Sequence, residues 1–210
     1  MKSGLKSRAQ QKGETRDRIL ASAATMMKER GIAGASVAEV MGSLGLTVGG
    51  FYAHFASKDD MVDQSLRRAM AQRRQRFNDY LDLTKWRDRL SRMTSRYLTK
   101  EHRDDAAGGC PLPGVMADVG RTGTGQAALG DEIAALVTTL TGEQWDEDPR
   151  ARQAALAIIA LTAGGLSLAR ALGRTALSDE VLEACRGFAE QTLAKRNVGQ
   201  SSPRIRAKTH

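Results

Sequence analysis

The segment SVAEVMGSLGLTVGGFYAHFASK, residues 36–58, decides the fold that the sequence predicts. Its apolar residues fall at helical spacing in two short runs, one before and one after Gly45. The runs are Val37, Val40, Met41 and Leu44, and then Val48, Phe51, Tyr52 and Phe55. Two short amphipathic helices joined by a tight glycine-containing turn, with Leu46 filling the corner, are typical of a helix-turn-helix. The spacing alone would also fit any small helical hairpin.

The outward residues of the second helix favour contact with DNA over plain packing. Glycine costs about 1 kcal/mol against alanine inside a helix, yet Gly49 and Gly50 stand side by side here. Close approach to an outside surface explains that cost, because a helix that enters the major groove needs a slim N-terminal end. Thr47 can hydrogen-bond to a base edge or a phosphate, and the methyl groups of Val48 suit a thymine methyl.

Polar groups that could reach the DNA backbone follow this helix. Tyr52 and His54 have polar tips suited to phosphates. Ser57 and Lys58 begin the next helix, whose free N–H groups and cation would attract the same strand. The segment holds no Arg, Asn or Gln for a bidentate base contact. We therefore expect its sequence specificity to depend on apolar contacts and on DNA shape.

The rest of the chain predicts an all-α protein of about nine helices, because helical periodicity and capping residues recur and strand patterns are nearly absent. The first helix should cover residues 15–30 and stop at Gly31. Helices should then begin at Ser36, with a capping box, at Thr47, and at Ser57, the last running to about residue 81. The later helices are expected over residues 85–101, from Cys110-Pro111 onward, over 126–140, over 149–172, and from Ser178 to about 195.

The net charge of +8 is concentrated at the two ends of the chain. Residues 1–18 carry +4 and residues 195–210 carry +5, whereas the remainder carries −1. We expect basic disordered tails over residues 1–14 and 198–210. Such tails either add non-specific attraction to phosphates or serve only solubility.

Cysteine usage and hydropathy indicate a soluble cytoplasmic protein. Two cysteines in 210 residues form no disulfide framework, and no C-x-x-C suggests a zinc site. The polar, basic N-terminus predicts no export signal. The longest uncharged stretch, residues 154–169, is short for a membrane span and suits a buried helix.

Three segments resemble, in order and spacing, the N-terminal domain of the TetR repressor family. They are TRDRIL (residues 15–20), SVAEV (36–40) and GLTVGGFYAHFASKDDM (45–61). One departure is Ala56, where many members have proline. The resemblance implies a three-helix DNA-binding domain over residues 15–62, a larger ligand-binding and dimerisation domain over 63–197, and a fourth helix linking them. By position, the family's DNA contacts would fall on Ser36, Thr47, Val48, Gly49, Gly50, Tyr52, His54 and Lys58.

The helices after residue 148 are candidates for a homodimer interface. Residues 149–172 are rich in Ala, Leu and Gly, and the last helix has a broad apolar surface. Small residues permit close helix approach, and two such helices from each subunit would form a four-helix interface. The alternative is that both helices are buried within one subunit. A dimer also suits a palindromic operator, whose half-sites lie about one helical turn of DNA apart or a multiple of it.

A pocket for a small-molecule inducer is expected among the middle helices. Its candidate lining residues are Trp86, Met93, Tyr97, Met116, Leu136 and Trp145, and each of them could equally be plain core. Cys110 is a sharper candidate, because we expect its thiol at a helix N-cap, accessible and stabilised as thiolate. The Gly-Cys pair resembles the branch of the family that senses electrophiles and oxidants. Alternatively, Cys110 is a small helix-entry residue beside an apolar pocket, and Cys185 is expected to be buried packing.

The sequence thus predicts a ligand-responsive transcriptional repressor. It would bind a palindromic DNA operator as a homodimer, and an inducer or modification of Cys110 would release it. One alternative is a non-specific nucleic-acid binder that uses the basic tails, and another is a helical enzyme. The second has little support, because His54, His102 and His210 lie far apart and no metal, phosphate-loop or nucleophile motif occurs. We expect no cofactor, no metal and no membrane partner.

Overall fold

The structure, a computed structural model, describes residues 7–78, 85–142 and 149–194. These residues form ten α-helices and no strand, so the all-α prediction is confirmed. The helices are α1 (Arg8–Arg30), α2 (Val37–Ser43), α3 (Val48–Phe51), α4 (Lys58–Asn78), α5 (Trp86–Tyr97), α6 (Lys100–Asp104), α7 (Leu112–Thr122), α8 (Gln126–Thr141), α9 (Pro149–Ala171) and α10 (Ala176–Ala194).

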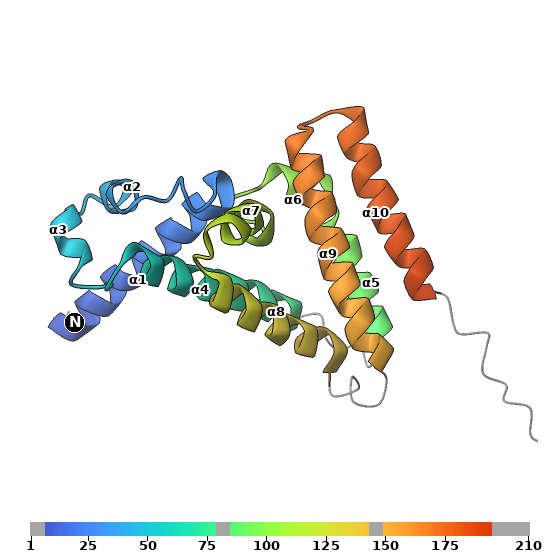
Figure 1. Ribbon diagram of the computed structural model, residues 1–210, viewed down its shortest axis with the longest axis horizontal. Coiled ribbons are helices and arrows are strands. Elements are labelled where there is room, and N and C mark those ends of the chain that lie inside the picture. Colours follow the sequence, from blue (N-terminus) through green and yellow to red (C-terminus); the bar gives the residue numbers. More distant parts are fainter. Residues whose placement is uncertain (1–6, 79–84, 143–148, 195–210) are drawn as a thin grey trace, which may run out of the picture.

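The first three helices and the start of α4 form a head at one end of the molecule (Figure 1). Its core is built from side chains that the predicted helical periodicities turn inward. They are Ile19, Ala23 and Met27 of α1, Val40 and Met41 of α2, Phe51 of α3, and Phe55. Gly31 ends α1 with a φ of 74°, in the left-handed region that favours glycine.

Several local predictions about the head need correction. Helix α1 begins at Arg8 rather than at residue 15, because Ser7 and Gln10 form a capping box, so residues 8–14 are helical instead of disordered. The second helix of the helix-turn-helix is a single turn of four residues, and Tyr52 already ends it. The expected end of α4 near residue 81 and the tails over 1–6 and 198–210 lie outside the described residues.

The body contains the long helices α4, α5, α8, α9 and α10, with α7 between head and body (Figure 1). Helix α4 runs from the head along α8, so head and body share one continuous helix. The shared hydrophobic core continues from the head through α7 into the body. The two parts are therefore packed into one another rather than joined by a linker.

Three predicted helix boundaries in the body are wrong. The single helix expected over 85–101 is two helices, because the chain breaks at Leu98 and Thr99 caps α6. Helix α7 begins at Leu112 with Pro111 as its N-cap, one residue later than expected. Ser178 lies inside α10; its backbone N–H donates to the Thr175 hydroxyl at 3.2 Å, so Thr175 does the capping.

Helix α9 is long and apolar enough that length and composition would also suit a membrane span. Its buried residues recur at helical spacing and pack against α5, α8 and α10. At Gly165 a Cβ atom would lie 2.8 Å from the Cys185 sulfur, so glycine allows α9 and α10 to pack closely. This packing is that of a core helix, and it leaves Cys185 half-buried between the two helices.

Candidate nucleic-acid interface and internal cavity

Helix α3 presents its N-terminal end to solvent. Thr47 is its N-cap, and the Thr47 hydroxyl accepts a hydrogen bond from the Gly50 N–H at 3.3 Å. Val48 and Tyr52 are 47% and 68% exposed, side by side with the exposed Thr47 and Gly49. A Cβ atom at Gly49 would meet nothing within 4 Å, so packing inside the protein does not require glycine there.

Two phenylalanines fix α3 to the head. The rings of Phe51 and Phe55 are nearly fully buried and stack with centroids 5.3 Å apart. Tyr52 meets Phe51 edge-on at the same centroid distance and remains exposed. The inner face of this short helix is therefore rigidly held while its outer face is free for contact.

Sequence reasoning missed Arg16, which connects α1 to the turn after α3. Its guanidinium donates to the His54 carbonyl oxygen at 2.7 Å, hydrogen-bonds the side chain of Gln64, and lies 4.6 Å from the centre of the Phe55 ring. His54 itself is half-buried, and burial, with Lys12 and Arg16 nearby, lowers the pKa of its imidazole. His54 is thus a neutral and only partly accessible candidate for a phosphate contact.

The other candidate contacts lie at the starts of α2 and α4. The Ser36 hydroxyl accepts from the Glu39 N–H and the Ser36 N–H donates to the Glu39 carboxylate, each at 3.2 Å, as the predicted capping box requires, and the hydroxyl also donates to that carboxylate at 2.7 Å. These bonds lower the pKa of the Glu39 carboxyl. The Ser57 hydroxyl likewise accepts from the Asp60 N–H at 3.1 Å, beside a half-buried Lys58. Helices α2 and α4 are therefore capped by Ser36 and Ser57, the two residues at which the sequence predicts that they begin.

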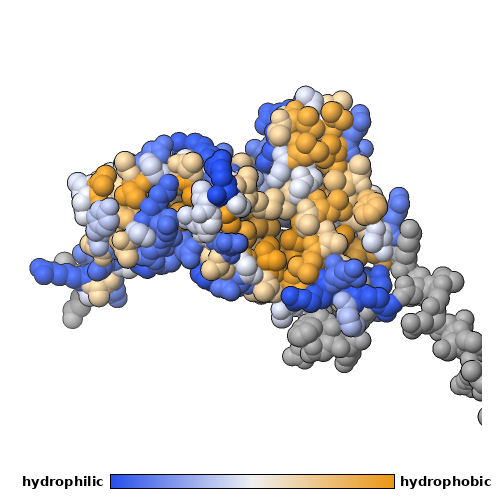
Figure 2. Space-filling model, in the orientation of Figure 1, coloured by the Kyte–Doolittle hydropathy of each residue, from blue (hydrophilic) through white to orange (hydrophobic). Residues whose placement is uncertain are grey.

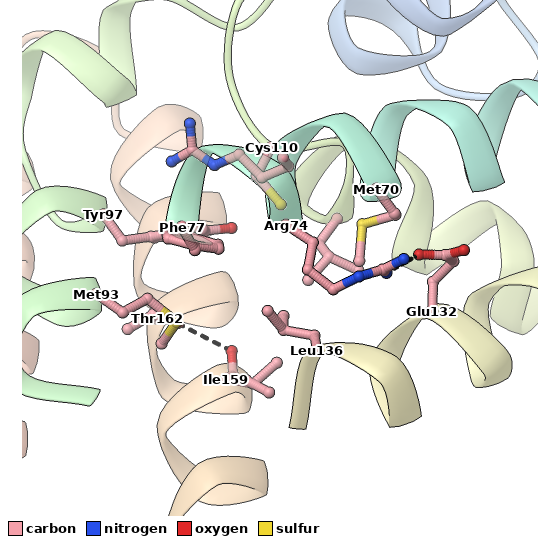
Figure 3. Close-up of a pocket in the computed structure, with 12 residues that line it drawn as sticks. Met70, Arg74, Phe77, Met93, Tyr97, Cys110, Glu132, Leu136, Ile159 and Thr162 are labelled. Atoms are coloured by element: carbon pink, nitrogen blue, oxygen red, sulfur yellow. Dashed lines mark hydrogen bonds and ion pairs between the residues drawn. The ribbon is translucent and has the colours of Figure 1, made fainter. Parts of the chain in front are cut away.

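The body contains a narrow cavity whose free space for a water-sized group is about 20 Å³ (Figure 3). Its lining residues come from five helices and the segment before α7. They are Met70, Arg73, Arg74, Phe77, Met93, Tyr97, Cys110, Leu112, Glu132, Leu136, Ile159 and Thr162. The free space has room for about one water molecule, so a larger occupant would have to displace side chains of the wall.

Four of the residues nominated from the sequence line this cavity: Met93, Tyr97, Cys110 and Leu136. Trp86 is buried elsewhere, and Met116 packs half-buried against the core without lining the cavity. Trp145 lies outside the described residues.

Sequence reasoning overlooked the whole wall that α4 contributes. Met70, Arg73, Arg74 and Phe77 follow the i, i+3, i+4, i+7 spacing of one helix face, which was visible in the sequence. This face was not recognised as a cavity wall because two of its four residues are arginines, and charged residues are usually assigned to a solvated face. Arg74 is neutralised in the wall by an ion pair with Glu132 (Figure 3).

Cys110 is buried, with only 3% of its surface exposed, so the predicted accessible N-cap thiol is wrong. The residue lies before the Pro111 cap, and its N–H donates to Nε2 of His102 at 3.0 Å. His102 Nδ1 in turn pairs with the Tyr97 carbonyl oxygen at 2.7 Å. Burial lowers the pKa of His102 to about 4, so the ring is neutral and Nδ1 is the donor.

The head is connected to the cavity wall through the end of α1. The Asp118 carboxylate of α7 accepts from the Ile32 N–H at 2.7 Å. Lys28 donates to the carbonyl oxygen of Ala107, in the segment that leads to Cys110, at 3.0 Å. A Cβ atom at Gly114 would lie 2.6 Å from the Lys28 carbonyl oxygen, so α7 touches the α1 backbone directly. These contacts join the end of α1 to α7 and to the segment that carries Cys110 into the cavity wall.

Comparison with known proteins agrees with the geometry of the head. Residues 19–64 match the family model described as bacterial regulatory proteins, tetR family. The chain is 37% identical over 76 residues to the HTH-type transcriptional repressor KstR2 of Mycobacterium tuberculosis, which covers 36% of this chain and 38% of that protein. It is 40% identical over 57 residues to KstR2 of Mycolicibacterium smegmatis, covering 27% of this chain and 28% of that one. The chain thus matches well under half the length of these curated relatives.

Solved structures resemble the chain over most of its length. A TetR transcriptional regulator from Chloroflexus aurantiacus is 25% identical with a TM-score of 0.66, covering 89% of this chain and 97% of that one. The reduced form of NemR from E. coli is 21% identical with a TM-score of 0.68, covering 85% and 96%. The fold and the exposed α3 define a helix-turn-helix protein with a helical body. Residues 19–64 match the DNA-binding domain of the TetR family, and the fold over most of the chain is that of solved TetR-type regulators.

Proposed function

We propose that the protein is a transcriptional repressor that binds a palindromic operator as a homodimer and is released by a small molecule. The observation that carries the proposal is the form of α3, whose inner face is held by Phe51 while Thr47, Val48 and Gly49 are exposed to solvent. The match to the TetR family supports a regulator rather than an enzyme. A cytoplasmic location, with access to DNA, is part of the same proposal.

The operator contacts are the eight residues that the family resemblance indicates, namely Ser36, Thr47, Val48, Gly49, Gly50, Tyr52, His54 and Lys58. The slim N-terminal end of α3 would enter the major groove, with Val48 against a thymine methyl and Thr47 at a base edge or phosphate. Ser36 and Lys58 at the starts of α2 and α4, with Tyr52, would contact the phosphates on either side. His54, half-buried, has the least room to do so.

A fluorescence anisotropy titration tests this interface. The full chain is titrated onto duplexes selected from a random pool, and one palindromic sequence should bind several kcal/mol more tightly than the rest. The variant Val48→Glu adds a carboxylate at an exposed site facing the phosphates and should abolish specific binding. Ala127→Glu adds the same charge at an exposed site of α8 and should leave binding unchanged. Equal binding to all duplexes would contradict the proposal.

The basic tails supply the alternative, a non-specific binder. Removing residues 1–6 and 199–210 leaves every described helix intact. The proposal expects a uniform loss of affinity and a lower salt dependence, with the same preferred duplex. If the tail-less protein loses its sequence preference, the tails and not α3 carry the recognition.

Homodimer formation is supported by an apolar face that α9 and α10 leave exposed. On α9, Leu156 and Leu168 lie at the ends of a row that also contains Gly164, where a Cβ atom would meet nothing within 4 Å. On α10, Leu177 and Phe188 are 55% and 63% exposed. Figure 2 shows apolar surface over α9 and over the end where α9 meets α10. Two copies of this helix pair would bury it as a four-helix interface.

Analytical ultracentrifugation tests the dimer. The unmodified chain should sediment as a dimer, and Leu168→Glu with Phe188→Glu should produce a folded monomer that no longer binds the operator tightly. Ala127→Glu is again the matched control. A double variant that remains dimeric would show that the interface lies elsewhere.

The inducer site is the cavity between α4, α5, α8 and α9. Because α4 runs from the head into the cavity wall, an occupant that displaces Met70 or Phe77 would shift the spacing of the two recognition helices. Modification of the Cys110 thiol would fill the same space and have the same effect. The variant Cys110→Ser tests the second route: operator release by oxidants or electrophiles should disappear, and unchanged release would exclude Cys110 as the sensor.

A further inference from the structure

Two polar groups of the cavity wall are buried without a hydrogen-bond partner. They are the Nε of Arg73 and the Tyr97 hydroxyl, which makes no hydrogen bond to nitrogen or oxygen and has the Cys110 thiol, a weak partner, beside it. Tyr97 is 96% buried, with 4% of its surface exposed. A buried polar group that makes no bond costs about 1–3 kcal/mol, so such groups in a cavity indicate a missing partner. Because Arg73 can only donate and a phenol donates readily, that partner is an acceptor.

The charge around these groups is positive. Arg73 lies 5.3 Å from the centre of the Phe77 ring and 5.8 Å from that of Tyr97. Within the described ranges no carboxylate pairs with Arg73, whereas its neighbour Arg74 is neutralised by Glu132. Arg170 is fixed nearby by its bonds to the carbonyl oxygens of His102 and Arg103. Arg73 and Arg170 both act electrostatically on the Tyr97 hydroxyl.

The opposite end of the cavity is apolar. Figure 3 shows Met93, Leu136 and Ile159 on the side away from Cys110, with Thr162 among them. The Thr162 hydroxyl already donates within α9, 2.8 Å from the Ile158 carbonyl oxygen and 3.1 Å from that of Ile159. That end therefore offers a ligand hydrophobic contact and no free donor.

We infer that the cavity binds a small amphipathic carboxylate. Its carboxylate accepts hydrogen bonds from the Tyr97 hydroxyl and the Arg73 guanidinium, and its hydrocarbon tail lies between Met93, Leu136 and Ile159. The inference rests on the proposed function, because it names the chemical class of the inducer. The free space in the cavity is only about 20 Å³, room for about one water-sized group, so the tail enters by displacing Met70 or Phe77, as the proposed release requires, and decanoate serves as the probe.

Isothermal titration calorimetry of the full chain with decanoate, 1-decanol and decylammonium measures how much the headgroup charge adds to the affinity, because the three ligands share one hydrocarbon tail. Decanoate should bind at least about tenfold more tightly than decanol, because charged hydrogen bonds in a dry site carry that much. Decylammonium should bind most weakly. Equal affinity for decanoate and decanol, or no decanoate binding at about 1 mM, would overturn the inference.

Two variants assign the headgroup contacts. Tyr97→Phe removes only the unpartnered hydroxyl and keeps the packing, and Arg73→Gln removes the unpaired cation. Each should weaken decanoate binding about tenfold and leave decanol binding unchanged. Arg67→Gln is the matched control, because Arg67 is on the same helix but pairs with Asp131 on the surface. Decanoate affinity that survives both cavity variants would refute the assigned contacts.

A second readout locates the ligand without reference to DNA. Cys110 is buried in the cavity wall and Cys185 is not part of it, so iodoacetamide reaches Cys110 only when the cavity opens. Bound decanoate should slow that alkylation further in peptide mass spectra and leave that of Cys185 unchanged. Equal protection of both cysteines would contradict the site. If decanol but not decanoate released the operator, the carboxylate inference would be refuted and the proposed repressor function would stand. If the protein preferred no duplex sequence at all, the proposed function itself would be refuted.

Discussion

Gly114→Ala tests the closest contact between head and body. The added methyl carbon would lie 2.6 Å from the Lys28 carbonyl oxygen and 2.7 Å from that of Met27. Carbon and carbonyl oxygen rarely pack closer than about 3.3 Å, so α7 would have to withdraw by roughly 0.7 Å. Neither oxygen can turn away, because both belong to the last turn of α1 and the Met27 oxygen accepts the N–H of Gly31 at 3.0 Å.

The expected loss follows from two opposing terms. Overpacking of this kind costs about 1–3 kcal/mol, and alanine returns at most about 1 kcal/mol of helix propensity. Gly120 provides the matched control, because it lies on the same helix and a Cβ atom there would meet nothing within 4 Å. Gly120→Ala should therefore gain up to about 1 kcal/mol while Gly114→Ala loses about 1–2 kcal/mol.

Thermal unfolding followed by circular dichroism, at one protein concentration, measures the difference. In a chain of this size 1 kcal/mol shifts Tm by about 2–4 °C, so the two alanine variants should melt roughly 5–10 °C apart. The same order should appear in urea midpoints. If Gly114→Ala melts with or above Gly120→Ala, α7 does not rest on the α1 backbone.

Three further predictions concern the head and the buried histidine. Thr47→Ala removes the hydroxyl that accepts the Gly50 N–H, so α3 should lose about 1 kcal/mol of capping and gel-shift assays should show weaker operator binding. Arg16→Gln removes the bond to His54 and the contact with its neighbouring ring, so operator affinity should fall about tenfold while far-ultraviolet circular dichroism is unchanged. Because His102 has a pKa of about 4 in the fold and about 6.5 unfolded, the unfolded state takes up the proton first. Stability should thus fall by up to about 3 kcal/mol as pH drops from 6.5 to 4, as measured by urea unfolding.

Each of these predictions has a conservative control. Thr47→Ser keeps the capping hydroxyl and should restore binding. Arg92→Gln removes the same charge from an exposed site of α5 and should leave operator affinity unchanged. His102→Gln should remove its part of the pH dependence; a pH profile identical to that of the unmodified chain would mean that another group titrates.

The head was almost fully predictable because its signals are local. Capping at Ser36 and Thr47 and the inward spacing of Phe51 and Phe55 operate over one or two helical turns, and the structure has all of them. The body was less predictable. Just after the break between α5 and α6, which Thr99 caps, His102 is buried against Cys110, and these two residues meet through folding rather than through helix periodicity.

The residues that line the cavity were also only partly predictable from the sequence. Tyr97 and Leu136 were nominated as amphipathic and apolar residues of middle helices, but Arg73 was not, because a charged residue on a helix is normally solvated. Cys110 was expected near the ligand pocket, and it lines the cavity. It was also expected to be accessible, but it is buried, because burial depends on what packs over a residue and not on its neighbours in sequence.

By itself the sequence determined most of the helices, the helix-turn-helix and the resemblance of residues 19–64 to the TetR family, since periodicity, caps and glycines act over a few residues. The tertiary structure decided which side chains enclose the cavity, that Tyr97 and Arg73 face it without partners, and that Gly114 rests on the backbone of α1. The physical reason is that burial and electrostatic environment are set by helices far apart in the chain, which only packing brings together.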